Sequence, residues 1–457
     1  MAAALLALMP GRAQAGGFSV ARFGGEHGHA ATTDVTAAFY NPAGLAYERG
    51  HRGYLEGLLA YRTVDYTRDP GAIDNPGTGT PDNAVNSGTA TLGNLVASPF
   101  LGLASDLGVP GLGVALAVYA PFGGSSSWDA DDRFAGNTMY PGAVDGPARW
   151  SSIEGEQRSL YYTLAAGYRI PAARLAIGVG VNVVSTDINL IRARRIDGTD
   201  DVVDAGGNVA EGRSLLELSD TSLSLSAGLM YEPTPCSRVG ISYQASPGLG
   251  EMTVDGTLTN KFGATPAQAP VDVQMRQTLP DVVRVGGTWN AFWRASLHAV
   301  VEWQRWSKFE RQCLVDRNFA GARCDFNADG SLAAGADGVL VNIPRDWQDT
   351  FGVKLGGTYD LTDTLELNGG VLYDSNAVPD ATLEPALIDQ DKIITQLGAR
   401  WQSGRWLASS TLGLATYLER TTAPRTADPM TPSRNPDMAG TYQQRTMYFM
   451  LGLGASL

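Results

Sequence analysis

Few residues in this chain of 457 have types and spacings that could perform chemistry. The four histidines, His27, His29, His51 and His298, do not stand with a Ser and an Asp in a triad spacing, or with Cys in a metal-binding spacing. The sequence therefore predicts that the protein is not an enzyme. For His27 and His29 two interpretations stay open: a pH-sensitive pair in the N-terminal segment, or ordinary solvated histidines of a loop.

The three cysteines are consistent with an oxidising compartment. Cys313 and Cys324 lie in one polar stretch rich in Asp, Asn and Gly, where a disulfide would form outside the cytoplasm. No second cysteine pair or nearby His completes the four ligands of a zinc site. We expect a disulfide between Cys313 and Cys324, with two free thiols as the alternative, and we assign no role to Cys236.

The sharpest local motif is Asp325-Phe-Asn327-Ala-Asp329, followed by a Gly. Alternating oxygen ligands before a turn-forming glycine are typical of the start of a calcium-binding loop. The twelfth position is Ala336, so the bidentate Glu that completes such a loop is missing. Two interpretations follow: a structural calcium site formed by Asp325, Asn327 and Asp329, or a plain polar turn. No cofactor is expected to be required.

The composition restricts the class of protein. Gly contributes 55 residues and charged residues only 18%, while 9 Trp, 17 Tyr and 13 Phe supply too much apolar surface for a disordered chain. No run of ~18 consecutive apolar residues is present, which excludes a helical membrane span. The net charge of -13 and the lack of basic clusters argue against a nucleic-acid partner.

The N-terminus indicates export from the cytoplasm. Residues 1–8 are apolar and small, and Ala13-Gln-Ala15 fits the small-residue pattern that precedes signal-peptide cleavage. We expect residues 1–15 to be the remnant of a signal peptide that lacks its charged n-region. A short buried N-terminal segment is the alternative.

After residue 50, bulky apolar residues alternate with small or polar ones. In 175–183 the odd positions are Leu, Ile, Val, Val and Val, and the even positions are Ala, Gly, Gly and Asn; 223–231, 351–359 and 365–373 follow the same design. A period of two indicates β-strands with one bulky apolar face. In a soluble sandwich, glycines would be scarce in the strands. In a membrane barrel, the bulky face meets lipid and the small polar face lines the lumen.

The connections between these strands predict their number. Long polar segments alternate strictly with short turns, which gives thirteen connections and hence fourteen strands. The short turns are near 106–110, 171–173, 233–236, 290–294, 361–363 and 402–405, and the long segments near 67–96, 122–155, 190–214, 249–269, 307–346, 375–390 and 420–441. The sequence thus predicts an all-β fold: a 14-stranded antiparallel transmembrane β-barrel over residues 51–457, with its short turns at the periplasmic rim.

Residues 16–50 do not alternate. The segment is rich in Gly, and its short helices are expected to begin near Asp34 and to end at Pro42. A barrel of fourteen strands encloses a lumen too wide for its own side chains to fill. We therefore expect residues 16–50 to form a hatch inside the lumen.

At Asn41-Pro42-Ala43-Gly44 the chain resembles the FadL family of outer-membrane transporters for hydrophobic compounds, whose hatch carries an Asn-Pro-Ala motif. Further matches follow in order over nearly the whole mature chain: 120–123, 279–281, Trp303 with Trp306, 345–350, 373–380 and 389–392. The resemblance implies a monomer in the outer membrane of a Gram-negative bacterium. Its partners would be a hydrophobic small molecule and the lipid of that membrane.

The resemblance also implies a transport route. Family members capture a hydrophobic molecule among extracellular loops and release it sideways, after the hatch shifts, through a gap made by a kink in the third strand. A lateral exit avoids returning the solute to water at ~25 cal/mol per Å². Here the gap is expected at Pro121, Phe122, Gly123 and Gly124, because Pro cannot donate to the ladder and Gly tolerates bends. An ordinary exit of the strand into its loop is the alternative.

The sequence defines the substrate less clearly than it defines the fold. Alternation places Lys354 and Arg400 on the lumen side, where either could pair with a fatty-acid carboxylate or with an acidic residue of the lumen. We expect uptake of long-chain fatty acids, with uptake of aromatic hydrocarbons as the first alternative. A general porin and a structural or adhesive barrel are further alternatives. An outer-membrane phospholipase would need a nucleophilic Ser near a His, and His298 alone does not supply that pair.

Overall fold

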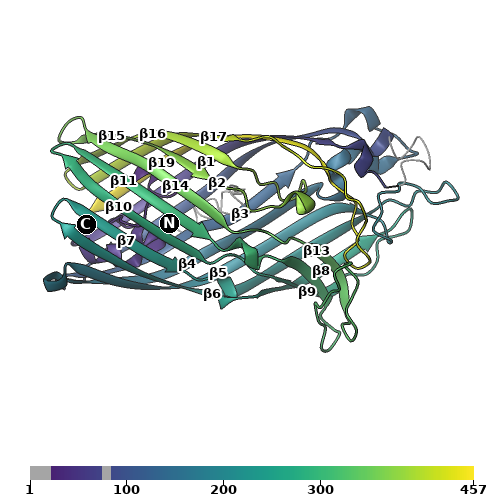
Figure 1. The fold of residues 1–457 in the computed structure, drawn as a ribbon, viewed down its shortest axis with the longest axis horizontal. Helices are drawn as coiled ribbons and strands as arrows, with labels where there is room; N and C mark the ends of the chain where they lie inside the picture. The colour runs from purple at the N-terminus through teal and green to yellow at the C-terminus, as the bar shows by residue number, and fades with distance from the viewer. Residues whose placement is uncertain (1–21, 75–83, 457) are drawn as a thin grey trace.

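Long antiparallel strands close into a barrel in the computed structural model, which describes residues 22–74 and 84–456 (Figure 1). The expected signal-peptide remnant, 1–15, lies outside the described residues. Fourteen strands form the closed ring, as the connections predict. In ring order they are β1 (His51–Arg68), β2 (Gly88–Ser105), β3 (Leu112–Ser127), β4 (Glu154–Ile170), β5 (Leu175–Arg194), β6 (Gly212–Thr234), β7 (Ser237–Gln244), β10 (Val282–Phe292), β11 (Ala295–Gln304), β14 (Thr350–Asp360), β15 (Leu365–Asp374), β16 (Lys392–Ser403), β17 (Trp406–Tyr417) and β19 (Gly440–Ser456).

The ring closes between its first and last strands. β1 pairs with β19 over its whole length, from Arg52 opposite Ser456 to Arg68 opposite Gly440. The start of β1 and the end of β19 therefore lie together at the rim of short turns, on the left in Figure 1. Closure leaves no open sheet edge in the lipid, where unpaired backbone groups would be costly.

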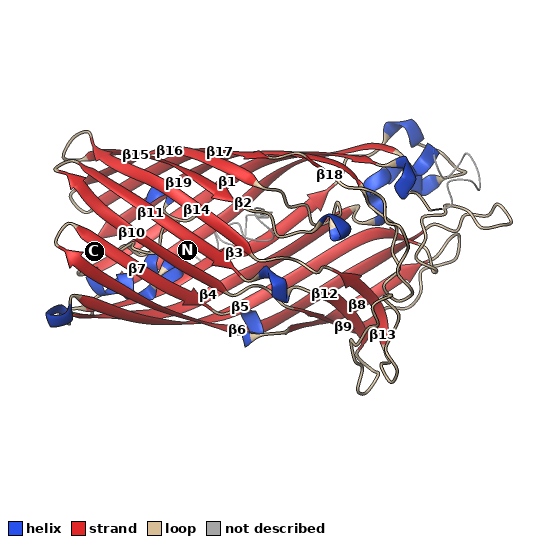
Figure 2. Cartoon of the chain, viewed as in Figure 1, coloured by secondary structure: helices blue, strands red, loops and turns tan. Residues whose placement is uncertain are grey.

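Two of the long segments expected as loops contain strands. The segment 249–269 contains β8 (Met252–Lys261), with β9 (Val271–Gln277) directly after it, and 307–346 contains β12 (Arg311–Asp316) and β13 (Val339–Pro344). β8 pairs with the loop-side end of β6, and β9, β12 and β13 follow in order. This four-stranded extension lengthens the wall beyond the ring (Figure 2). A two-residue strand, β18 (Arg420–Thr421), pairs with β19.

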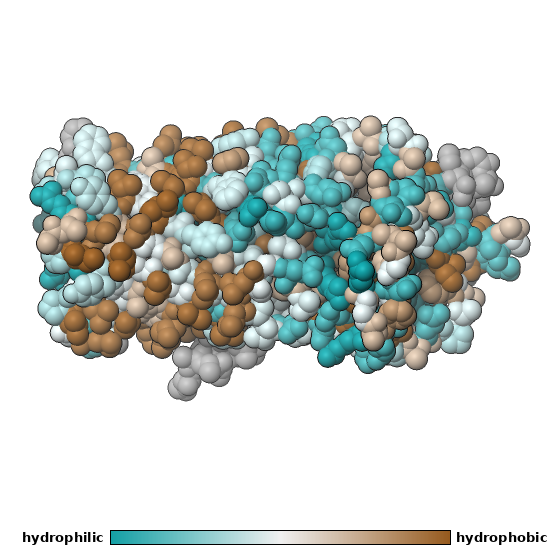
Figure 3. Space-filling view, turned by 60° about the horizontal axis from the view of Figure 1, so that its bottom comes forward, coloured by the Kyte–Doolittle hydropathy of each residue, from teal (hydrophilic) through white to brown (hydrophobic). Residues whose placement is uncertain are grey.

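The alternation predicted from the sequence is present in the burial of the strands. In β5, Ile177, Val179 and Val181 point outward and are exposed, whereas Gly178 and Asn182 point inward and are buried. Figure 3 shows that apolar residues cover the half of the barrel with the short turns, while hydrophilic residues dominate the half with the long loops. The apolar half is the part that suits lipid, because its exposed side chains are aliphatic and aromatic.

The helices are short and lie in the N-terminal segment and in the connections between the strands. No helix within 22–74 and 84–456 is long and apolar enough to cross a membrane. The N-terminal segment contains η1 (Gly25–His27), α2 (Ala37–Tyr40) and η2 (Pro42–Tyr47). The connections contain η3 (Pro70–Ala72), η4 (Asp132–Phe134), η5 (Pro141–Asp145), η6 (Pro147–Trp150), η7 (Pro171–Ala173), η8 (Pro247–Leu249), η9 (Trp306–Lys308) and η10 (Asp380–Thr382).

Candidate functional site: the N-terminal segment, the wall at β3 and the barrel interior

The Asn-Pro-Ala motif begins η2 and fixes it to the wall. Asn41 is the N-cap: its Oδ1 accepts a hydrogen bond from Ala43 N at 3.1 Å. Its Nδ2 donates to Ala30 O at 2.7 Å and to Leu229 O of β6 at 3.0 Å. Pro42 ends α2 as expected, but it also starts η2, because proline is favoured at the first position of a helix. One buried amide thus joins two turns of the N-terminal segment to the barrel.

A row of glycines on neighbouring strands receives this motif. Gly113 of β3, Gly167 of β4, Gly178 of β5, Gly228 of β6 and Gly240 of β7 face inward, and we call them the glycine seat. A Cβ on Gly178 would overlap the backbone of the motif, and a Cβ on Gly228 would overlap its Asn side chain. The backbone of the N-terminal segment reaches the wall because these positions lack side chains.

A buried acid ties the opposite side of the segment to other strands. Glu26 accepts hydrogen bonds from His298 Nε2 at 2.6 Å and from Gln396, and it lies 3.5 Å from Lys354 Nζ. Lys354 also donates to Gly25 O at 3.0 Å. Of the two partners expected for Lys354, the acidic residue is the one found. Glu26, His298 and Lys354 lie together inside the barrel, where a charge without a partner would cost free energy.

Arg400 also faces inward, and it lines a cavity whose walls include Val35, Trp406 and Leu407. It also lines a polar cavity of 260 Å³ together with His27, Asp34 and Glu366. His27 bonds Glu366 at 2.7 Å, and His29 is 7% exposed with its ring stacked on that of His298. The interpretation of His29 as a solvated loop residue is therefore wrong. The cavity lies near the rim of short turns, since it also contacts turn residue Asn290.

The wall between β2 and β3 is only partly hydrogen-bonded. β2 pairs with β3 from Phe100 opposite Tyr119 to Ser105 opposite Val114, and in the described chain the residues 88–99 of β2 pair with β1 alone. Across the unpaired stretch, Ser98 Oγ donates to Ala120 O at 3.2 Å and Asn94 Nδ2 contacts Ser125 Oγ at 3.0 Å. Side chains bridge this part of the wall where a backbone ladder would otherwise run.

The four residues expected at a wall opening lie at this place. β3 is irregular between Tyr119 and Phe122, so that Ala120 and Pro121 have no regular partners on β4. Gly123 and Gly124 follow directly and pair with β4 again. The stretch is part of a long strand, so the alternative of a simple exit into a loop is wrong. The proline and the bulge explain why Ala120 and Pro121 lack regular partners on β4, since neither supports regular pairing.

Aromatic rings form a chain from the loops to the N-terminal segment. Trp306 lies beside Phe122 at a centroid distance of 6.3 Å, and Phe122 lies 6.2 Å from Tyr161. Tyr161 stacks on Tyr119 at 5.7 Å, and Tyr119 contacts Phe23 at 5.7 Å. The rings belong to one buried apolar cluster that fills the interior above the N-terminal segment. An apolar molecule would meet rings along this whole line, which passes the irregular part of β3.

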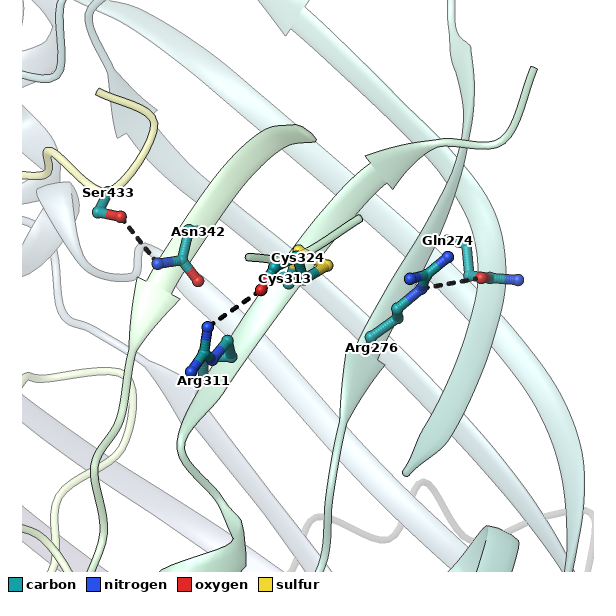
Figure 4. The surroundings of a disulfide bond; sticks show 7 residues. All are labelled: Gln274, Arg276, Arg311, Cys313, Cys324, Asn342 and Ser433. Carbon is teal, nitrogen blue, oxygen red and sulfur yellow. Dashed lines mark hydrogen bonds between the residues drawn. A yellow bond between two sulfur atoms is a disulfide. The ribbon is translucent and has the colours of Figure 1, made fainter. Parts of the chain in front are cut away.

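The disulfide expected from the sequence is present. Cys313 of β12 and Cys324 are bonded, with their Cα atoms 6.2 Å apart, and Cys236 is a free, exposed cysteine (Figure 4). Arg311 Nη1 donates to Cys324 O at 3.1 Å beside the bond. The disulfide closes the loop that follows β12 in the extension of the wall.

The predicted calcium motif is held by its own neighbours. Asp325 forms an ion pair with Arg323, Asp329 accepts from Ser331 N at 3.0 Å, and Asn327 Nδ2 donates to Ser331 Oγ at 2.9 Å. No group of three His, Cys, Asp or Glu suited to a metal ion occurs within 22–74 and 84–456. Calcium binding by this turn stays a prediction.

Sequence reasoning missed the glycine seat and the partner of Lys354. The alternation predicts glycines at inward positions, but the pattern of a single strand does not show that five glycines from five strands line up. Their positions would have been found by aligning the inward residues of consecutive strands at equal height above the short turns.

Comparison with known proteins identifies one family of outer-membrane proteins. The family described as "Outer membrane protein transport protein (OMPP1/FadL/TodX)" matches residues 6–412. The putative outer membrane protein NMB0088 of Neisseria meningitidis is 23% identical over 82% of this chain and 79% of its own length.

Solved structures with the same fold include transporters of two kinds. A FadL homologue of Pseudomonas aeruginosa superposes with a TM-score of 0.74 at 19% identity, covering 96% of this chain and 99% of that one. The toluene transporter TodX of Pseudomonas putida superposes with a TM-score of 0.65 at 14% identity, covering 93% and 95%. Identities this low establish the shared barrel and leave the substrate open.

Proposed function

The chain belongs to the outer membrane protein transport protein family (OMPP1/FadL/TodX), and we propose that it takes up long-chain fatty acids across the outer membrane. The substrate is captured by the extracellular loops and passes along the aromatic interior. The N-terminal segment acts as a hatch that rearranges, and the substrate leaves sideways through the wall between β2 and β3. The coarser statement, an outer-membrane barrel of a family that transports hydrophobic compounds, is established by the family itself.

One observation carries the lateral route: the missing ladder between residues 88–99 of β2 and the second half of β3. Separating these strands there costs few backbone hydrogen bonds, whereas the neighbouring seam between β1 and β2 is paired from His51 to Arg68 and would lose a full ladder. Phe122 stands beside this seam and belongs to the aromatic chain, so the apolar path reaches the wall where the wall is weakest. A substrate leaving there passes from aromatic side chains into lipid without crossing water.

The aromatic lining also supports a second candidate, the uptake of monoaromatic hydrocarbons. Ring pairs along the interior, such as Tyr119 with Tyr161 at 5.7 Å, provide surfaces on which a small aromatic molecule would stack. Fatty acids remain the first proposal because the FadL homologue superposes on the chain with a TM-score of 0.74, against 0.65 for TodX.

The lateral route is tested by stapling the seam. Asn94 and Ser125 face each other across it with side-chain atoms 3.0 Å apart, so Asn94→Cys with Ser125→Cys, in a Cys236→Ser background, places two thiols within reach. Oxidation should abolish most uptake of radiolabelled fatty acid by cells that express the protein. Reduction should restore it.

A staple across a closed seam is the matched control. Thr67 of β1 and Thr89 of β2 have side-chain oxygens 2.8 Å apart where the two strands are fully paired, so Thr67→Cys with Thr89→Cys should leave uptake unchanged after oxidation. The Cys236→Ser parent receives the same reductant, since the native disulfide is also exposed to it. Full uptake through an oxidised Asn94–Ser125 staple would exclude lateral exit at this seam.

A further inference from the structure

One buried histidine of the N-terminal segment has no part in the proposed route. His29 is 7% exposed and lies between two cavities. It lines the polar cavity of 260 Å³ near the rim of short turns, and it lines a smaller cavity of 60 Å³ that includes Val300 and Glu302, farther from that rim. The polar cavity also includes His27, whose side chain is 24% exposed, so water reaches it. Protons from the periplasm therefore have access to His29.

The hydrogen bonds of His29 fix its protonation state. Its Nδ1 accepts a hydrogen bond from Ala31 N at 3.1 Å, so this nitrogen carries no proton. The proton of the neutral ring is then on Nε2, which faces Thr288 Oγ1 of β10 at 3.4 Å. A second proton, on Nδ1, would place two N–H donors against each other and break the bond to Ala31. The docked segment thus requires a neutral His29.

The negative charge of this cluster already has its partners. The rings of His29 and His298 of β11 are stacked, with their centroids 4.9 Å apart. His298 Nε2 lies 2.6 Å from Glu26 Oε2, and Lys354 Nζ lies 3.5 Å from the same oxygen. Because a carboxylate only accepts, His298 Nε2 must be the donor in its bond. A proton on His29 would add a positive charge beside Lys354 without a new carboxylate to receive it.

The groups that face His29 are mostly basic. They are Glu26 and His27 of its own segment, Arg238 of β7, His298 of β11 and Lys354 of β14. The polar cavity adds two further charges of each sign, which are those of Asp34, Arg52, Glu366 and Arg400. Across the smaller cavity the charges are paired with one another, Arg22 with Asp374 at 2.8 Å and Arg284 with Glu302 at 2.6 Å.

The pKa of His29 follows from this environment. Burial, followed by the effects of His298 and Lys354, lowers it well below its usual 6.5. In a released segment the ring is solvated and titrates near pH ~6.5. The stability that neutral His29 gives to the docked segment is therefore complete above pH ~6.5. Below that value, the ratio of docked to released segment falls about tenfold per pH unit until the docked pKa is reached.

We propose that His29 is an acid-sensitive latch between the N-terminal segment and the barrel wall, which holds the segment while the ring is neutral and releases it when the ring is protonated. The inference rests on the proposed role of the segment as a hatch, and it adds a condition under which the hatch leaves the wall. Release joins the two cavities that His29 separates. Acid in the periplasm thus opens the periplasmic end of the barrel.

Other groups of the segment respond to acid in another range or with the opposite sign. Burial acts to raise the pKa of Glu26, but the hydrogen bond from His298 and the charge of Lys354 bring it below 4.5, so Glu26 stays ionised at pH 5. Burial raises the pKa of Glu48 to about 7, so its proton favours the docked state. The effect of His29 is therefore measured against a variant that lacks only this ring.

The test is hydrogen exchange of the purified full chain in a non-ionic detergent at pH 7.5 and pH 5.0. Protection factors for the amides of Ala37–Tyr40 are calculated against the intrinsic rate at each pH, which removes the direct effect of pH on exchange. His29→Asn keeps an acceptor near the place of Nδ1 but cannot be protonated. The ratio of parent to His29→Asn protection should fall about tenfold or more between pH 7.5 and pH 5.0.

His27→Asn is the matched control, because this ring lies in the same cavity and bonds Glu366 at 2.7 Å. Protonation strengthens that pair, so the ratio of parent to His27→Asn protection should stay level or rise on acidification. Slow exchange in β5 confirms that the barrel of each variant is folded. His29→Gln, which also stays neutral, repeats the measurement if His29→Asn does not fold.

The outcomes separate the latch from the uptake function. A level ratio of parent to His29→Asn overturns the latch, and so does an equal fall of the ratio of parent to His27→Asn. Uptake of hydrophobic molecules stands in either case, because the Asn94–Ser125 staple tests it without acid. If the His29→Asn ratio falls while the stapled protein takes up fatty acid, the latch stands and the lateral route is overturned.

Discussion

At the scale of single residues, Asn41 holds the N-terminal segment by three hydrogen bonds from one side chain. It caps η2 through Ala43 N and reaches the carbonyls of Ala30 and Leu229. The amide is fully buried, so water cannot replace these bonds when the side chain is removed. Asn suits this position because it both donates and accepts, which Asp and Leu of similar size cannot do.

We expect Asn41→Ala to weaken the docking of the segment by about 1–3 kcal/mol, because buried backbone groups lose their partners. Hydrogen exchange of the amides in Pro42–Tyr47 should accelerate, while exchange in β5 stays slow. Asn137→Ala removes an Asn that also accepts from nearby amides, but in a loop, and should leave this region unchanged. Equal protection in the parent and in Asn41→Ala would contradict the anchoring role.

At the scale of elements, the glycine seat holds the N-terminal segment against the wall, and buried ion pairs hold the extracellular loops together. Five strands offer flat, side-chain-free surfaces to one short helix, and a buried acid joins the other side of the same segment to β11, β14 and β16. Above the ring, buried ion pairs join separate loops, as between Arg149 and Glu211 at 3.1 Å and between Arg68 and Asp200 at 2.6 Å. The N-terminal segment and the extracellular loops are thus held by contacts between residues far apart in the sequence.

A methyl group on the seat should displace the segment. Gly178→Ala places a Cβ against the backbone of Ala43, and overpacking of this kind costs typically about 1–3 kcal/mol. Proteolysis within the N-terminal segment should become faster without unfolding of the barrel. Gly57→Ala is the matched control, since nothing lies within 4 Å of a Cβ there. Identical proteolysis of the two variants would show that the seat does not hold the segment.

The extracellular loops should loosen as pH rises. Burial, followed by the charge of Asp200, raises the pKa of Asp74 to about 7 from 3.8. The folded loops therefore keep a proton that the unfolded chain loses near pH 4, so their stability is highest below pH ~4 and falls as pH rises through ~7. Loop proteolysis should be faster at pH 8 than at pH 5, and Asp74→Asn should reduce this difference. An unchanged pH dependence in Asp74→Asn would assign the effect to other groups.

At the scale of the whole molecule, a closed wall and a filled interior distinguish this barrel from an open pore. The ring seals between β1 and β19, and the buried aromatic cluster and the N-terminal segment occupy its inside. On the face drawn in Figure 3, exposed apolar residues gather over the half with the short turns, which indicates the part of the barrel that meets the membrane.

Deletion of 22–48 should open the barrel. We expect the shortened protein to conduct ions in planar bilayers far more than the parent, because the glycine seat and the polar cavity of 260 Å³ would then face an unfilled lumen. Uptake of fatty acid should fall in the same variant if the segment is a hatch. Equal conductance of the two proteins, with both folded, would mean that the segment does not block the lumen.

Alternation along single strands predicted much of the fold. Residues 175–183 indicated which face of β5 meets lipid, and the alternation of short and long connections gave the fourteen strands of the ring. The same reasoning could not separate loops from the extension formed by β8, β9, β12 and β13. Those strands alternate as ring strands do, for example with Val273 and Met275 of β9 buried and the residues next to them polar, so a period of two does not tell an extension beyond the ring from a strand of the ring.

The sequence by itself determined the local features: the strand faces, the short turns, the Asn-Pro-Ala motif and the cysteines able to pair. Only the tertiary structure decided which residues meet across long separations. It aligned five glycines beneath the segment around Asn41 and Pro42, and it gave Lys354 an acid from the N-terminal segment. The physical reason is that alternation specifies a side of the wall, whereas register and ring closure specify the neighbour, and both depend on the whole barrel at once.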